Sequence, residues 1–368
     1  MSSTYQLFQY DQPVMLESGA VLPRYHLMYT THGVLNAAGD NVVWIFHALT
    51  ANSDPAEWWP GLVGEGKLFD PAAYFIVCVN MPGSCYGSIG PLSINPHSKQ
   101  PYYHDFPFFT TRDMIKAYQP LKRRLGINKI RVGIGGSMGG QQLLEWAIEE
   151  PELFEYIIPI ATNAQHSPWG IAFNTAQRMA IEADQSWEQR SQQAGAEGMR
   201  AARAMALLSY RHYNTYSKLQ ARRDGFLSES LTVQDAYGKS SSHSAASYQR
   251  YQGEKLVRRF SAFSYYMLSL SMDSHDVSRN RDSIEKALQR IQSKTLVIGI
   301  ESDILFPLPE QQLLASSIPG AGFKVIDSLY GHDGFLLEFE QIGKQARILL
   351  EHCKENLQND KQQMQHGM

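Results

Sequence analysis

The stretch Ile130-Arg131-Val132-Gly133-Ile134-Gly135-Gly136-Ser137-Met138-Gly139-Gly140 decides the fold. A short apolar run passes directly into a G-x-S-x-G motif, and apolar side chains at helical spacing follow between residues 143 and 148. Strand, tight turn and helix in this order are the setting of a nucleophile elbow, whose glycines make room for a strained turn at the serine. The sequence therefore predicts that Ser137 is a nucleophile. The alternative interpretation is a glycine-rich turn with a helix-capping serine.

Other short apolar runs surround this stretch and indicate the class of fold. They span residues 42–46, 74–79, 156–160, 295–300 and 323–326. Such runs, separated by segments of helical spacing, are typical of buried parallel strands in a doubly wound α/β sheet. Residues 25–29 instead alternate between apolar and polar, so we expect an antiparallel strand to open the sheet.

The regular alternation of strand and helix stops between about residues 163 and 293. This part of the chain is rich in Ala, Gln, Arg and Tyr and contains almost no strand-like run. We therefore predict a catalytic α/β domain formed by residues 1–162 and 293–368, with a helical lid inserted over residues 163–292. Within the insertion, the serine-rich stretch 237–244 is expected to form a loop, and the polar tail 354–368 is expected to fray.

Composition narrows the class of protein further. The chain has 368 residues and a net charge of -3, which gives no basic field for nucleic acid or an anionic membrane. No apolar run approaches the roughly 18 residues of a membrane span, and the first residues do not resemble a signal peptide. Three cysteines, Cys78, Cys85 and Cys353, are too few for a disulfide framework, so we expect a cytoplasmic protein.

A serine nucleophile needs a base and an orienting acid, which follow it in the chain order Ser, Asp or Glu, His. Asp303 comes just after one predicted strand, and His332 comes just after the next. Loops at the carboxyl ends of parallel strands gather at one edge of a sheet. We therefore predict that His332 takes the proton of Ser137 and that Asp303 orients His332. Asp70 or Glu301 could compete for the acid role, and His332 could be an ordinary loop histidine.

An acyl-transfer site also needs donors for the developing oxyanion. One donor is expected in the loop after the first buried parallel strand, residues 47–51, and the other at the start of the helix after the elbow. The backbone amides of Leu49 and Met138 are the candidates. The alternative is that the loop only packs on the elbow.

Two charged residues are candidates for substrate binding. Arg203 lies in a segment, residues 201–208, that is apolar nearly all round, so we expect a buried helix and a guanidinium that needs an anionic partner. That partner could be a substrate carboxylate or a carboxylate of the insertion itself. Asp333 directly follows His332 and could bind a substrate ammonium, or it could be a turn residue.

Several segments together resemble one family, the homoserine O-acetyltransferases. They are His47–Thr50, Trp58–Gly64, Cys85–Ser88, Ser93–Pro96, Phe106–Pro107, Thr111–Met114, the elbow with Gln142–Trp146, Ile171–Asn174, Arg250–Lys255, Met272–Val277, Ser302–Pro307 and Tyr330–Asp333. The resemblance covers about residues 10 to 350 and is far more specific than the elbow motif alone.

The resemblance implies an α/β-hydrolase fold, with a mostly parallel eight-stranded sheet flanked by helices and an inserted helical lid. It implies a homodimer joined through the lids, acting on L-homoserine and an acyl-CoA in methionine biosynthesis. Acetyl-CoA is the implied co-substrate, and no metal or other cofactor is expected. By position within the motifs, Ser137, Asp303 and His332 form the triad. Arg203 takes the place of the carboxylate-binding arginine, and Asp333 that of the substrate-binding aspartate.

A weaker candidate and three departures concern the substrate pocket. Arg178 is a further pocket candidate by resemblance. Ala51, Ser84 and Phe263 stand where the family often has Gly, Gly and Asn. These departures leave open whether the donor is acetyl-CoA or succinyl-CoA and whether the acceptor is homoserine or serine.

The expected mechanism is ping-pong transfer through an acyl-serine. A hydrolase that uses water as the acceptor would share the elbow and the triad. Arg203 and Asp333 favour an amino-acid acceptor, because an esterase needs no clamp for one. A non-catalytic scaffold derived from an enzyme is the remaining alternative, and the intact triad argues against it.

Overall fold

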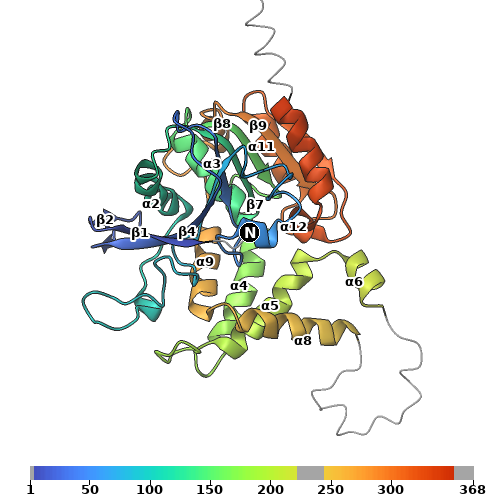
Figure 1. The fold of residues 1–368 in the computed structure, drawn as a ribbon. Helices are drawn as coiled ribbons and strands as arrows, with labels where there is room; N and C mark the ends of the chain where they lie inside the picture. The colour runs from blue at the N-terminus through green and yellow to red at the C-terminus, as the bar shows by residue number, and fades with distance from the viewer. Residues whose placement is uncertain (1–3, 222–243, 352–368) are drawn as a thin grey trace, which may run out of the picture.

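The computed structural model of the protein describes residues 4–221 and 244–351. Its centre is an eight-stranded sheet flanked by helices (Figure 1). In spatial order the strands are β1 (Tyr5–Tyr10), β4 (Tyr25–His32), β6 (Phe75–Val79), β5 (Val42–Phe46), β7 (Ile130–Gly136), β8 (Phe154–Ile160), β9 (Lys294–Ile300) and β10 (Gly322–Ile326). Strands β1, β4 and β6 pair antiparallel, and every pair from β6 to β10 is parallel. The predicted mostly parallel eight-stranded sheet is therefore confirmed.

The strands differ in how clearly the sequence pattern predicts them. The central strand β5 is buried along its whole length, as its continuous apolar run predicts. Arg131 interrupts the apolar run of β7, and it pairs with Glu155 on the neighbouring strand β8. The edge strand β1 was not among the predicted strands, because every second residue of it is exposed and it carries no continuous apolar run. Two short strands, β2 (Val14–Met15) and β3 (Val21–Leu22), form a separate hairpin.

Helices cover both faces of the sheet. Trp44 in β5 faces the core that the sheet shares with α2 (Thr111–Arg124) and α3 (Met138–Glu149). Its neighbour Ile45 faces the opposite core, which is closed by the helical residues 339–351. The remaining elements of this part are α1 (Pro55–Trp58), η1 (Tyr103–Asp105), α11 (Leu308–Ser317), η2 (Gly331–Asp333) and α12 (Gly334–Leu337). A sheet buried on both faces explains the continuous apolar runs.

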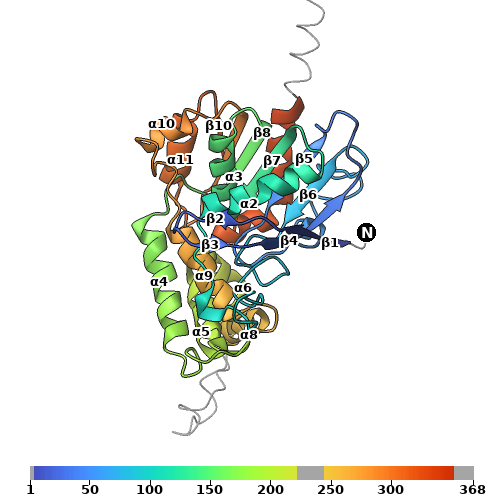
Figure 2. The same cartoon turned by 90° about the vertical axis from the view of Figure 1, so that its left-hand side faces the viewer.

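The long connection from β8 to β9 contains helices joined by turns, and none of its described residues belongs to a named strand. It contains α4 (Pro168–Glu182), α5 (Ala196–Tyr210), α6 (Tyr213–Leu219), α8 (Ser244–Val257), α9 (Ala262–Asp273) and α10 (Ile284–Leu288). Helices α4, α5, α6, α8 and α9, called the lid helices below, lie together on one side of the sheet (Figures 1 and 2). Helix α10 packs against α3 and α11 instead. The domain boundaries stay a prediction. Most of the expected serine-rich loop, and the expected fraying tail, lie outside the described residues.

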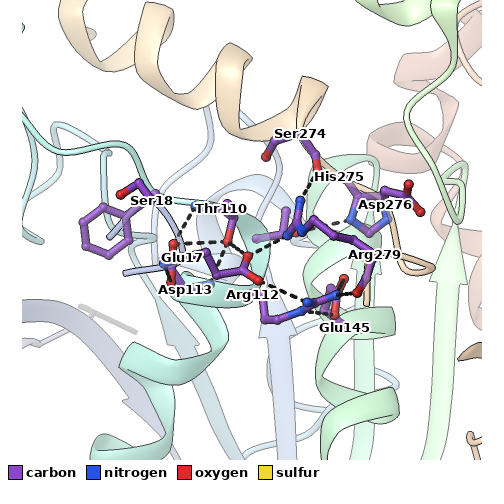
Figure 3. A network of polar contacts seen from close by, with 12 residues as sticks. Glu17, Ser18, Thr110, Arg112, Asp113, Glu145, Ser274, His275, Asp276 and Arg279 are labelled. Atoms are coloured by element: carbon purple, nitrogen blue, oxygen red, sulfur yellow. Dashed lines mark hydrogen bonds and ion pairs between the residues drawn. The ribbon is translucent and has the colours of Figure 1, made fainter. Parts of the chain in front are cut away.

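A buried network of ion pairs joins the segment that follows α9 to the core (Figure 3). The fully buried carboxylate of Glu145 in α3 meets Arg112 Nε at 3.3 Å and Arg281 Nη2 at 2.8 Å. Glu17, from the turn between β2 and β3, contacts Arg112 at 3.0 Å and Arg279 at 2.6 Å. Burial raises the pKa of Glu145, but the neighbouring cations, Arg281 foremost, outweigh it and hold that pKa below its usual value. The chain that leaves α9 is thus tied to α2 and α3 by paired charges.

Among the described residues, no helix has both the length and the hydropathy needed to cross a membrane.

Candidate active site

The elbow places Ser137 on a strained turn between β7 and α3. Its backbone has φ 57° and ψ -129°, a conformation that costs energy for any residue but glycine. A Cβ on Gly135 would lie 2.6 Å from the backbone of Gly139, and a Cβ on Gly139 would lie 2.1 Å from the carbonyl oxygen of Phe46. The Thr162 hydroxyl donates to the Ser137 carbonyl at 2.8 Å. The glycines therefore allow the close approach of helix and strand that holds the serine in place.

The three predicted triad residues meet with their side chains almost fully buried. Ser137 Oγ lies 2.9 Å from His332 Nε2, and His332 Nδ1 lies 2.6 Å from Asp303 Oδ2. The other Asp303 oxygen, Oδ1, accepts from the amides of Leu305 at 2.8 Å and Phe306 at 2.9 Å. Because the acid is fixed by its own loop, it can fix the imidazole, which in turn presents one nitrogen to the serine.

Neither alternative acid is part of this arrangement. Asp70 accepts from the backbone amides of Gly66 at 2.7 Å and Ala72 at 2.9 Å in a separate turn. Glu301 is exposed, although it lies only two residues before Asp303. The geometry therefore selects Asp303 among the three candidates.

Three aromatic rings surround the imidazole of His332, and sequence reasoning missed all of them. Phe306 stacks on it at 5.0 Å between ring centroids and an angle of 22°. Phe335 meets it edge-on at 5.3 Å, and Tyr210 of α5 lies at 5.9 Å. Rings on several sides restrict rotation of the imidazole and place an apolar wall around its hydrogen bonds. No local pattern predicts this cluster, because its members come from three distant parts of the chain.

The loop after β5 lies next to the elbow and is held by a buried histidine. His47 Nδ1 donates to the carbonyl of Ala48 at 2.9 Å, and His47 Nε2 accepts from the amide of Met81 at 3.1 Å. Burial lowers the pKa of His47 to about 4, so the ring is neutral, as this pair of contacts requires. Leu49 lines the same cavity as Ser137, and Met138 is the first residue of α3. The roles of the Leu49 and Met138 amides stay predictions.

A cavity of about 600 Å³ opens between the triad and the lid. Its volume falls within the range of about 300–1,000 Å³ that is usual for small-molecule sites. Its lining comes from the loop after β5, α1, the loop after β6, the elbow, α5 and α8 with the residues just after them, η2 and α12. The lining residues are Ala48–Asn52, Glu57, Trp58, Tyr86, Ser137, Arg203, Tyr210, Arg211, Gln252, Lys255, Leu256, Arg259, His332, Asp333, Phe335 and Leu336. Ser137, His332 and both predicted substrate-binding residues therefore border one space.

Arg203 reaches this cavity from α5, but the helix differs from the prediction. Its guanidinium carbon lies 5.3 Å from the ring centroid of Tyr210, and no carboxylate of residues 4–221 or 244–351 pairs with it. The expectation of a buried helix is wrong, because α5 exposes Met205 and Leu208. The apolar composition of α5 reflects small alanines and an outward apolar face, and Arg203 itself is only half-buried.

Asp333 also borders the cavity, and it has a partner that the sequence did not indicate. Arg211, the residue directly after α5, places Nε 3.1 Å from Asp333 Oδ2. Arg211 lines the cavity as well. Sequence offers one signal for a role of Arg211 in the cavity, which is its position eight residues after Arg203, just past the end of the same helix.

The other pocket candidates fall in different places. Arg178 does not line the cavity, because it pairs with Asp273 at 2.7 Å inside the lid. Of the three departures from the family pattern, only Ala51 borders the cavity. Phe263 stacks on Trp187 at 4.9 Å in an aromatic cluster elsewhere. In the described part of the chain, no cluster of His, Cys, Asp and Glu could hold a metal ion.

Fold and site together define an enzyme of the α/β-hydrolase class with a Ser-His-Asp triad. The family model for the alpha/beta hydrolase fold matches residues 41–339. A homoserine O-acetyltransferase from Cyclobacterium marinum is 47% identical over 343 residues, which cover 92% of this chain and 93% of that relative. The chain therefore belongs to the homoserine O-acetyltransferase family, as its motifs predicted.

Solved structures agree with this assignment of the fold. A homoserine O-acetyltransferase from Bacillus anthracis superposes with a TM-score of 0.86 at 24% identity, covering 95% of this chain and 98% of that one. An acetylester hydrolase from Corynebacterium glutamicum reaches a TM-score of 0.82, also at 24% identity, covering 95% of this chain and 96% of that one. One fold thus serves both a transferase and a hydrolase, and only the site can discriminate between them.

Proposed function

We propose that this enzyme transfers the acetyl group of acetyl-CoA to the hydroxyl of L-homoserine, a step of methionine biosynthesis, through an acyl-serine. The observation that carries the proposal is the shared cavity. Ser137 and His332 border a space that is also lined by Asp333 and by Arg203, whose guanidinium has no carboxylate partner among the described residues. The relative from Cyclobacterium marinum, named for this activity, supports it.

The first half-reaction forms the acyl-serine. His332 Nε2, 2.9 Å from the hydroxyl, accepts the proton as Ser137 Oγ attacks the thioester carbonyl. The amides of Leu49 and Met138 receive the oxyanion. The carbon–sulfur bond then breaks, and His332 returns the proton to the departing thiol. Asp303 stabilises the imidazolium that exists between these steps.

The second half-reaction uses the lid side of the cavity. Homoserine binds with its carboxylate on Arg203 and its ammonium on Asp333, which places its hydroxyl toward His332. His332 removes the hydroxyl proton, the oxygen attacks the acyl carbon, and Ser137 leaves with the proton from His332. The triad and backbone amides carry out every step, so the proposed chemistry uses no metal or further cofactor.

Two alternatives keep the same triad. Succinyl-CoA or L-serine could replace one substrate, and Ala51, which borders the cavity, is the departure that concerns this choice. Hydrolysis is the second alternative, which the acetylester hydrolase of the same fold illustrates. The cation of Arg203 favours an acceptor with a carboxylate over water, because a half-buried guanidinium is stabilised by an anion.

Thiol release measures both half-reactions and tests the proposal. Acetyl-CoA or succinyl-CoA is mixed with the enzyme and homoserine, serine or no acceptor, and free thiol is followed with time. We expect a single burst without acceptor and continuous release with acetyl-CoA plus homoserine. Continuous release at the same rate without any acceptor would instead identify a hydrolase.

We also propose that the enzyme is a cytoplasmic homodimer that pairs through its lids. The exposed apolar side chains of Met205 and Leu208 on α5 and Tyr251 on α8 support this arrangement. Light scattering after gel filtration gives the mass directly. A Leu208→Glu variant is expected to run as a monomer, whereas a wild-type protein that is itself monomeric would remove the proposal.

A further inference from the structure

The α5–α6 junction, residues 210–215, packs on the loop that carries His332. A Cβ on Gly331 would lie 2.9 Å from the amide nitrogen of His212 and 3.1 Å from the carbonyl oxygen of Tyr210, so the two backbones touch where a side chain would not fit. The Thr215 hydroxyl donates to the carbonyl of Leu329. The lid therefore contacts the histidine loop directly at its backbone.

Arg211 is the charged member of this junction, and it reaches both sides of His332. Its Nε lies 3.1 Å from Asp333 Oδ2, and its guanidinium carbon lies 5.6 Å from the ring centroid of Tyr330. Its own backbone is fixed, because the Arg211 amide donates to the Leu207 carbonyl at 3.0 Å and ends α5. A rigid helix end thus carries a cation to the residue after the catalytic base.

This contact matters because of what Asp333 could otherwise do. A carboxylate next to His332 is attracted to the imidazolium that forms during each half-reaction, and it would compete there with Asp303. The contact with Arg211 is an ion pair on Oδ2 without a hydrogen bond from Nε, and it leaves Oδ1 of this cavity-lining carboxylate for a second cation. The side chains of Arg211 and Asp333 are only 17% and 12% exposed, so water screens this pair weakly.

We propose that Arg211 is a positioning residue for the acceptor, acting through Asp333. It holds the carboxylate in the orientation that receives the acceptor's ammonium, and it does not touch the acyl donor. The inference rests on the proposed function, in which Asp333 binds that ammonium. It predicts that Arg211 affects the second half-reaction and leaves the first nearly unchanged.

A double-mutant cycle tests this on the full-length enzyme. The variants are Arg211→Gln, Asp333→Asn and the double variant, with Arg211→Lys as the conservative replacement. Arg258→Gln is the matched control, because Arg258 is a lid arginine in an exposed ion pair with Glu254. For each, the burst of thiol from acetyl-CoA is measured without acceptor, and KM and kcat are measured with homoserine and with 4-hydroxybutyrate, which lacks the ammonium.

We expect Arg211→Gln to raise KM for homoserine by about tenfold while changing the burst rate less than about twofold, with partial rescue in Arg211→Lys. The effect should vanish in the Asp333→Asn background and with 4-hydroxybutyrate. Additive effects of the two substitutions, or an equal slowing of the burst, would overturn the inference. If Asp333→Asn alone left KM for homoserine unchanged, the proposed function would fail with it. If only Arg211→Gln had no effect, the inference alone would fail.

Discussion

The core and the lid form opposite walls of one cavity and differ in whether their polar side chains already have partners within the chain. On the core side, Ser137, His332 and Asp303 are linked by hydrogen bonds within the chain. On the lid side, Arg203 has no carboxylate partner in residues 4–221 and 244–351. The core is thus arranged for chemistry before any substrate arrives, whereas the lid offers a charge that a substrate can pair. A catalytic site that is preorganised on one side and selective on the other is expected to respond differently to mutation on each side.

The largest effect should follow from breaking the core side. Asp303→Asn keeps the shape of the acid but removes the charge that orients and stabilises His332. We expect kcat to fall by about 10³–10⁴-fold and KM for homoserine to change little. Steady-state thiol release measures both. The comparison would be weakened if KM rose as much as kcat fell, because the acid would then also serve substrate binding.

The lid side should fail in the opposite way. Arg203→Gln removes the proposed carboxylate partner, so we expect KM for homoserine to rise by about 100-fold, the equivalent of about 2.7 kcal/mol. The acetyl burst without acceptor should stay within about twofold of wild type. Arg200→Gln is the control, because Arg200 lies on the same helix and pairs with Glu197 at 2.5 Å. A burst that slows in parallel with acceptor binding would mean that Arg203 also supports the first half-reaction.

The stability of the region where the chain passes between core and lid should depend on pH. The segment that enters the lid and the segment that leaves it meet where the His166 amide donates to the His275 carbonyl at 2.9 Å. Burial lowers the pKa of His166 to about 3 and that of His275 to about 4. Because these pKa values are depressed in the folded state, the unfolded chain binds more protons below about pH 6.5. Stability is therefore complete above that pH and is lost as the pH falls toward 4.

Urea unfolding at pH 7 and pH 5 measures this loss. A His275→Gln variant cannot titrate at that position, so its stability should fall less steeply, by about 1.4 kcal/mol per pH unit below pH 6. His97→Gln is the control at an exposed histidine. Equal slopes in wild type and His275→Gln would show that His275 does not contribute to acid sensitivity.

The smallest effect is expected for a core residue that only packs against the imidazole of His332. Phe306→Leu removes the ring stacked on His332 but keeps the backbone amide that holds Asp303. We expect kcat to fall by about three- to tenfold with KM nearly unchanged, and stability to urea to fall by about 1 kcal/mol, since leucine fills most but not all of the volume of this buried ring. A loss as large as that of Asp303→Asn would mean that the ring is essential to the geometry of the triad.

The same contrast between core and lid explains what the sequence could predict. Strand runs and their order placed Asp303 and His332 on neighbouring loops, because the carboxyl ends of parallel strands meet at one edge. No comparable rule predicts how the lid helices are arranged. The exposure of Met205 and Leu208 depends on how α5 is turned, and the Arg211–Asp333 pair joins positions that are distant in the chain. Only tertiary packing decides such contacts, so local patterns cannot reveal them.

The most direct test of the account is the intact mass of the protein after brief exposure to acetyl-CoA without acceptor. The account predicts one added acetyl group, located on Ser137 by peptide mapping, which disappears when homoserine is added and is absent in Ser137→Ala. Transfer of acetyl groups to homoserine at a near-normal rate by Ser137→Ala would contradict it.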